Sequence, residues 1–186
     1  TKLITGLAFA CILVSFNGLC DENLIRNPGF ENGAKEWLPW GKWDGFTKND
    51  TEKFMEIKST GTDGKGNCLK ITDSWNDKAP YVVQKISASK NASLTLTAKA
   101  RSETPSKARM GIQMLSKESD GSEKFINAQG VEFDVSNEWK TFTQTIGKIP
   151  DNASIIYVYI GATSGEQNET ATVEFDDIVL KTEKTN

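Results

Sequence analysis

Short runs of alternating apolar and polar residues, separated by residues that favour turns, follow one another along the chain after residue 20. In 94–98 leucine and alanine alternate with threonine, and in 110–114 methionine and isoleucine alternate with glycine and glutamine. A period of two gives a β-strand one buried and one exposed face, whereas no window keeps the period of an amphipathic helix. The predicted strands are 23–31, 54–58, 68–72, 81–86, 93–101, 107–116, 124–133, 139–146, 154–162 and 172–181.

The number of strands and their single dry faces predict the architecture. Two antiparallel sheets packed face to face bury two sets of apolar faces, so we expect an all-β sandwich, and specifically a jelly roll. The strand 154–162 adds a feature of its own. If Val158 and Ile160 serve the core, then Tyr157 and Tyr159 stand on the other face, where aromatic rings indicate a ligand or a partner.

The first twenty residues are predicted to be a secretory signal peptide rather than part of the fold. Lys2 precedes an apolar run over 3–16, and small or weakly polar residues follow it. The run is shorter than the roughly twenty residues that a membrane-spanning helix needs. Cleavage after Cys20 leaves one domain over 21–186 and predicts a secreted protein. A surface lipoprotein anchored at Cys20 is the alternative, and a retained Cys20 paired with Cys68 is also left open.

Composition removes several classes of function. The chain has 22 basic and 25 acidic residues, a net charge of −3 and no basic cluster, so nucleic acid is not an expected partner. It has no histidine, which removes Ser-His and Cys-His nucleophile pairs and the usual zinc ligand. Cys68 lies in an apolar strand, and we interpret it as a buried structural thiol.

Three carboxylates over 132–138 form the one constellation that suggests catalysis. Glu132, Asp134 and Glu138 resemble the Glu-x-Asp motif and second glutamate of some jelly-roll glucanases. Retaining hydrolysis needs two carboxyl groups about 5–5.5 Å apart on one face. Three residues separate Asp134 from Glu138, and they include a serine and an asparagine that favour a turn. The segment is therefore predicted to be a strand that runs into a turn.

The two ends of the predicted domain resemble one group of proteins. The segment 23–31 reads NLIRNPGFE and is followed by Trp37, which resembles the start of carbohydrate-binding modules of families 4, 9, 16 and 22. The segment VEFDDIVL at 173–180 resembles their closing strand, and GNCLKIT at 66–72, Trp75 and Trp139 lie between the two in the same order. The resemblance covers nearly all of 21–186. It implies a galactose-binding-like jelly roll that binds polysaccharide and does not catalyse a reaction.

The same resemblance implies a structural calcium ion where the first and last strands meet. Calcium takes six to eight hard oxygen ligands, which carboxylates and backbone carbonyls supply. By their positions in the two motifs, Glu31 and Asp176 are the candidate side-chain ligands, and Asp177 is the alternative. Carbonyl groups of the glycine-rich loop 61–66 are expected to complete the shell. The competing interpretation is that Glu31 ends a strand and the two aspartates are a solvated pair at an edge.

The resemblance and the residue types together select candidate sugar-binding residues. Sugar rings stack their C–H faces on aromatic side chains, and their hydroxyls need amide, carboxylate or guanidinium partners. By position in the family 22 pattern, the resemblance implies that Trp75, Phe125 and Tyr159 are stacking residues. Arg109 and Gln113, predicted to point outward on a neighbouring strand, are candidate hydrogen-bond donors. The full set of candidate ligand-binding residues is Trp75, Phe125, Tyr157, Tyr159, Arg109 and Gln113.

The sequence also departs from the family 22 pattern. Gly161 stands where that pattern has a glutamate, and the arginine expected before the tryptophan platform is absent, so xylan is not implied as the ligand. Of the other tryptophans, Trp37 and Trp139 are predicted to lie in the core. Trp40 and Trp43 lie in a loop-like stretch with proline and glycine, where they either extend a binding groove or cover one end of the sandwich.

The sequence favours two classes of function, and an enzymatic function is a third, less favoured alternative. The first is a non-catalytic, monomeric module that binds a plant, algal or microbial polysaccharide or oligosaccharide. The second is an extracellular structural or adhesion sandwich whose tyrosines contact protein, and a groove rather than a flat aromatic patch distinguishes the two. A glycoside hydrolase or lyase is the third alternative. Four Asn-x-Ser/Thr sequons do not decide between these classes, and they begin at Asn49, Asn91, Asn152 and Asn168.

Overall fold

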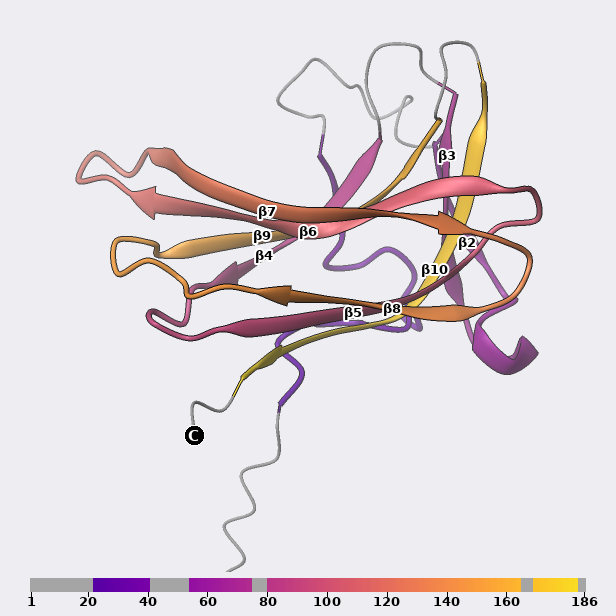
Figure 1. Cartoon of the computed structure of the whole chain (residues 1–186), viewed down its shortest axis with the longest axis horizontal. Helices are drawn as coiled ribbons and strands as arrows, with labels where there is room; N and C mark the ends of the chain where they lie inside the picture. Colours follow the sequence, from indigo (N-terminus) through magenta and orange to yellow (C-terminus); the bar gives the residue numbers. More distant parts are fainter. Residues whose placement is uncertain (1–21, 41–53, 75–79, 165–168, 184–186) are drawn as a thin grey trace, which may run out of the picture.

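The computed structural model describes residues 22–40, 54–74, 80–164 and 169–183, which form a two-layer β-sandwich (Figure 1). Every strand pair between these residues is antiparallel. The elements are β1 (Leu38–Pro39), β2 (Met55–Lys58), the 3₁₀ turn η1 (Thr62–Gly64), β3 (Cys68–Asp73), β4 (Tyr81–Ser87), β5 (Leu94–Arg101), β6 (Ser106–Lys117), β7 (Glu123–Val135), β8 (Lys140–Ile146), β9 (Ile155–Thr163) and β10 (Ala171–Thr182).

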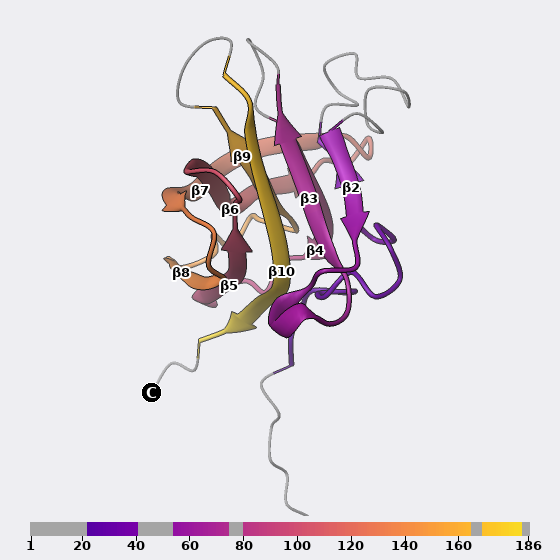
Figure 2. The same ribbon diagram turned by 90° about the vertical axis from the view of Figure 1, so that its right-hand side faces the viewer.

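The strands divide into two five-stranded sheets. Sheet A has the order β1-β4-β9-β6-β7, and sheet B has the order β2-β3-β10-β5-β8. Figure 2 shows sheet B turned toward the viewer, with strands of sheet A behind it. Apart from the β2-β3 and β6-β7 neighbours, consecutive strands lie in opposite sheets, as a jelly roll requires. The predicted all-β antiparallel sandwich is therefore confirmed.

The core lies between the two sheets and is made by the inner faces that the alternation predicted. The apolar residues of 94–98 on β5 and of 110–114 on β6 are fully buried. Val158 and Ile160 of β9 join the same cluster, so the tyrosines between and before them face outward. Nine of the ten predicted strands correspond to observed strands within a few residues. Within the described residues, no helix is long and apolar enough to cross a membrane.

The first predicted strand, 23–31, is wrong. This segment forms bends and turns instead, because Asn27 and Phe30 adopt φ values of 51° and 57°, which an extended strand does not contain. The Asn27 amide donates hydrogen bonds to the carbonyls of Gly33 and Lys35, both at 2.9 Å, and so closes the turn. The segment still meets the last strand, since the Leu24 N–H donates to the Leu180 carbonyl at 2.9 Å.

The tryptophans and Cys68 test the predicted core. Trp37 is 2% exposed, packs against Phe30 at 5.6 Å between ring centroids, and donates its indole N–H to the Asn27 carbonyl at 3.2 Å. Trp139 corrects the prediction, because it is only half-buried and lies under the Arg101 guanidinium, 4.8 Å from its ring centroid. Cys68 is fully buried and has no disulfide partner among the described residues, which exclude Cys20, and burial raises the pKa of its thiol, as expected of a structural residue.

The contrast between Trp37 and its neighbour Leu38 gives a stability test. We expect Trp37→Ala to lower the free energy of unfolding by about 3–5 kcal/mol, because it removes a buried ring and its hydrogen bond. Leu38→Ala is the matched control. Leu38 is 64% exposed, so its truncation should change stability by about 0.5 kcal/mol or less. Equilibrium denaturation monitored by tryptophan fluorescence and circular dichroism measures both, and equal losses would contradict the assigned core.

Candidate functional site

The outer face of sheet A presents side chains in rows that run across four strands. Residues directly opposite each other in antiparallel strands point to the same face. The register therefore aligns three outward rows, which are Tyr81, Gly161, Arg109 and Glu132, then Val83, Tyr159, Gly111 and Gly130, and then Lys85, Tyr157, Gln113 and Ala128. These rows alternate with the core residues, so burial of the inner face fixes what the outer face displays.

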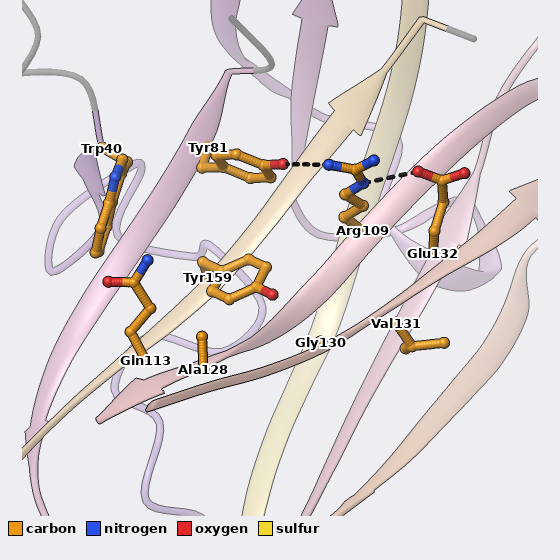
Figure 3. A pocket seen from close by; sticks show the side chains of 9 residues that line it. All are labelled: Trp40, Tyr81, Arg109, Gln113, Ala128, Gly130, Val131, Glu132 and Tyr159. Carbon is orange, nitrogen blue, oxygen red and sulfur yellow. Dashed lines mark hydrogen bonds and ion pairs between the residues drawn. The ribbon is translucent and has the colours of Figure 1, made fainter. Parts of the chain in front are cut away.

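A groove of about 450 Å³ lies over these rows (Figure 3). Residues of β4, β9, β6 and β7 line it, and Trp40 lies at one end beside Gln113. The lining residues are Trp40, Tyr81, Arg109, Gln113, Ala128, Gly130, Val131, Glu132 and Tyr159. Aromatic rings, a guanidinium, an amide and a carboxylate thus share one cavity.

Glycines make the floor of the groove low enough for aromatic rings to lie on it. A Cβ at Gly130 would overlap the Tyr159 hydroxyl, and a Cβ at Gly111 would lie 2.5 Å from the same hydroxyl. A Cβ at Gly161 would likewise overlap the Tyr81 ring. Glycine inside a strand marks this kind of close approach. The Tyr81 and Tyr159 rings, 5.4 Å apart and tilted by 69°, therefore rest on bare backbone.

One end of the groove is polar and held by hydrogen bonds. Arg109 donates from Nη1 to the Tyr81 hydroxyl at 3.1 Å and from Nε to Oε2 of Glu132 at 2.7 Å, as Figure 3 shows. Lys107 adds an ion pair to Oε1 of Glu132 at 3.4 Å. The hydrogen bond from Arg109 lowers the pKa of Glu132, so this carboxylate is ionised near neutral pH. Burial raises the pKa of Tyr159, which keeps its hydroxyl protonated.

Tyr157 stands on the same face but is covered. It is 8% exposed, and the Trp40 ring packs edge-on against it at 5.4 Å and 89°. Its hydroxyl donates to Oε2 of Glu123 at 2.9 Å, and the same glutamate pairs with Lys85. Tyr157 thus supports Trp40 from below rather than lining the groove.

Besides the covered Tyr157, the predicted ligand-binding residues lie in three different situations. Tyr159, Arg109 and Gln113 line the groove together. Phe125 is 58% exposed on β7 but does not line it. Trp75 lies outside the described residues, as does Trp43.

Among the groove residues with aromatic or charged side chains, the sequence does not assign Tyr81 or Glu132 to the binding site and leaves Trp40 undecided. The sequence pattern predicts only a strand at Tyr81, and Gly161, which lies opposite it, is the signal that leaves room for a ring. The sequence motif suggests Glu132 only as a catalytic carboxylate, whereas in the structure Glu132 pairs with Arg109 and Lys107. Trp40, for which the sequence allows either a place in the groove or a cover over one end of the sandwich, lines the groove.

A second cluster of oxygen atoms lies where the N-terminal turn meets β10 and η1. Asp176 is 5% exposed, and its Oδ2 accepts hydrogen bonds from the Thr62 N–H at 2.7 Å and from the Thr62 hydroxyl at 2.8 Å. Oε1 of Glu31 lies so close to Gly66, which has φ of +69°, that a Cβ there would be 2.5 Å from it. A Cβ at Gly29 would lie 3.4 Å from Oδ1 of Asp176 and 3.9 Å from Oε1 of Glu31, so both carboxylates converge there.

The carboxylate and carbonyl oxygens of this cluster are the kind of ligand that a hard cation takes. At Gly61 a Cβ would lie 2.5 Å from the Lys65 carbonyl and 2.8 Å from the Asn67 carbonyl, so these two oxygens lie beside the Asp176 carboxylate. No group of three or more acidic, cysteine or histidine side chains gathers among the described residues, and calcium does not need one, since carbonyls complete its shell. Asp177 points elsewhere and pairs with Lys99 at 2.9 Å.

Solved structures of low sequence identity share this fold. A carbohydrate-binding module of family 61 in complex with β-1,4-galactotriose has a TM-score of 0.58 and 16% identity, over 87% of this chain and 99% of that one. The CBM22-1 xylan-binding domain of Xyn10C from Paenibacillus barcinonensis has a TM-score of 0.54 and 14% identity, over 85% and 93%. Tailspike protein 4 of bacteriophage CBA120 has a TM-score of 0.60 and 11% identity over 87% of this chain, which spans only 21% of the tailspike domain. These likenesses establish the jelly-roll fold.

Sequence comparison gives the family. No curated protein matches the chain. The family model CBM_4_9, described as a carbohydrate binding domain, matches residues 22–170 and so spans the groove and most of both sheets. Because this match covers well over half of the sequence, the chain belongs to the CBM_4_9 family of carbohydrate binding domains.

Proposed function

We propose that the chain binds a polysaccharide in the groove of sheet A and does not catalyse a reaction on it. The observation that carries this proposal is the pair of rings, Tyr81 and Tyr159, that rest on a glycine floor inside a hollow face. Pyranose rings stack on such surfaces, which flat polar sheets do not offer. A groove also favours glycan over the flat protein-contact patch of an adhesion sandwich.

Polar groups around the rings supply the complementary contacts. Arg109 and Glu132 offer a donor and an acceptor at one end, and Gln113 offers both near Trp40. Because Arg109 is held by both Tyr81 and Glu132, its geometry is set before a ligand arrives, which lowers the entropic cost of binding. The stacking residues and the donors together suit a neutral ring with several hydroxyls.

The carboxylates of this face support a non-catalytic role. A general acid must hold a proton near neutral pH, whereas the hydrogen bond from Arg109 lowers the pKa of Glu132. Asp134 is 87% exposed and pairs with Lys107. Glu138 lies beyond the end of β7 at Val135, in the turn that the sequence predicted. These three carboxylates therefore do not supply an acid and a nucleophile that face one bound sugar.

We also propose secretion and a structural calcium ion. Secretion is supported by Lys2 and the apolar run 3–16, which have the pattern of a secretory signal peptide and lie outside the described residues. Calcium is supported by the convergence of Glu31, Asp176 and two loop carbonyls. When bound there, calcium would tie the N-terminal turn to β10 and the loop 61–66, and it would not touch the groove.

The proposed stacking of sugar on the tyrosine rings is tested at Tyr159. We expect Tyr159→Ala to weaken polysaccharide binding at least about tenfold, because it removes a stacking ring. The variant should lower the free energy of unfolding by less than truncation of an aromatic residue in the core, which costs about 3–5 kcal/mol. Tyr159→Phe keeps the ring and should bind nearly as well. Affinity electrophoresis against galactan, xylan, glucan, mannan and alginate, followed by calorimetric titration, measures binding, and thermal melting measures stability.

A variant at a second aromatic residue tests whether binding is confined to the groove. Phe125→Ala removes an exposed ring outside the lining and should leave affinity within about twofold. If Tyr159→Ala binds normally while Phe125→Ala does not, the groove is misassigned. If no polysaccharide retards the unsubstituted chain, the proposed function fails, and release of reducing ends from any of them would establish an enzyme instead.

The glycine floor makes a prediction of its own. Gly130→Ala should reduce binding about as much as Tyr159→Ala, because the new methyl group displaces the tyrosine ring. Gly147→Ala is the matched control, since a Cβ there has only ordinary contacts, at 3.8 Å from Gln129. Titration with the best-binding polysaccharide compares the two variants. Normal binding by Gly130→Ala would mean that the position of the Tyr159 ring does not matter.

The calcium proposal is tested by chelation. A cation that binds only the folded state stabilises it by mass action, by about 2.7 kcal/mol at one hundred times its Kd, so excess EDTA should lower the melting temperature by several degrees. Glu31→Gln and Asp176→Asn should abolish this calcium dependence, whereas Asp177→Asn should retain it. Polysaccharide affinity should change little. An unchanged melting temperature, in a sample shown to start metal-loaded, would remove calcium from the description.

A further inference from the structure

A second hollow of about 420 Å³ lies beside the groove, at the far ends of β4 and β9. Its lining residues are Arg26, Lys85, Ile86, Ser87, Ser154 and Ile155. We refer to it as the basic hollow, because its charged lining consists of one arginine and one lysine. The groove, in contrast, includes the carboxylate of Glu132.

Both cations are held in place by carboxylates that do not line the basic hollow. Arg26 pairs through Nη2 with Glu36 at 3.1 Å, which leaves its Nε and Nη1 without a partner among the described residues. Lys85 pairs with Glu123, and this hydrogen bond raises the pKa of the lysine, so it stays charged. Ser87 adds an exposed hydroxyl. A cavity with two fixed cations and a hydroxyl suits an anionic group.

Tyr157 lies between the basic hollow and the groove and contacts a lining residue of each. The Lys85 ammonium lies 5.6 Å from the centroid of the Tyr157 ring, and Trp40, which lines the groove, packs on the same tyrosine. Along β4 the outward residues Tyr81, Val83, Lys85 and Ser87 lead from one cavity to the other. Six residues of strand span about 20 Å, so a single extended polysaccharide reaches both.

We propose that the basic hollow is a subsite for an anionic substituent, a carboxylate or a sulfate ester, on the polysaccharide whose neutral rings occupy the groove. This inference rests on the proposed function. The net charge of the chain is −3, so general electrostatic attraction would favour cationic polymers, and a preference for acidic ones requires a local site.

The test compares one polymer in three forms. The probes are the neutral polysaccharide of the panel that binds best, its carboxymethyl derivative and its sulfate derivative. We expect at least one charged form to bind about five- to tenfold tighter than the neutral form, and this preference should shrink as salt rises from 50 to 500 mM. The derivative that gains affinity identifies the substituent. Equal affinities for all three forms would overturn the subsite.

Variants locate the preference. Arg26→Gln and Lys85→Gln, alone and combined, should remove it while leaving affinity for the neutral polymer unchanged. Lys58→Gln is the matched control, because Lys58 is a partly exposed lysine paired with Glu56 on sheet B. A preference that survives in the double variant would overturn the proposal. Tyr159→Ala weakens all three forms, so loss of the neutral polymer reports on the groove and loss of the charge preference reports on the basic hollow.

Discussion

Burial of alternating apolar positions between two sheets is the constraint on which the rest of this structure depends. Each strand of sheet A must give every second side chain to the core, so its remaining side chains share one outer face. On β9 this rule sends Ile156, Val158 and Ile160 inward and leaves Tyr157 and Tyr159 outside. A slip of one residue would exchange the two sets. The register that stabilises the core therefore also positions the binding face.

The outer face of sheet A is hollow because three of its positions are glycines, which have no side chain. Glycine inside a strand costs about 0.5–1 kcal/mol relative to alanine, and Gly111, Gly130 and Gly161 all lie on this one face. Their missing Cβ atoms let two tyrosine rings lie against the backbone. The cost in stability is modest beside the large apolar core, and it produces a hollow where a uniform sheet would be flat.

The charges of this face contribute to geometry more than to stability. Exposed ion pairs are worth about 0–1 kcal/mol, so the pair of Arg109 with Glu132 does little to hold the sandwich together. This pair instead fixes the direction of the Arg109 guanidinium, which would be variable if the side chain had no partner. The hydrogen bond from the Tyr157 hydroxyl to Glu123 holds the ring on which Trp40 packs in the same way.

The sequence by itself determined the strands, the two-layer architecture and the outward direction of Tyr157 and Tyr159, because these follow from a local period of two. It did not determine the turn at 23–31, where Asn27 side-chain bonds to residues six and eight positions later override a strand-like composition. Only the tertiary structure decided that Tyr157 lies beneath Trp40, that Phe125 lies outside the groove, and that Tyr81 and Glu132 lie within it. The physical reason is that the groove is built across four strands from distant parts of the chain, and the register between strands, unlike the period within one, is set by packing of the whole core.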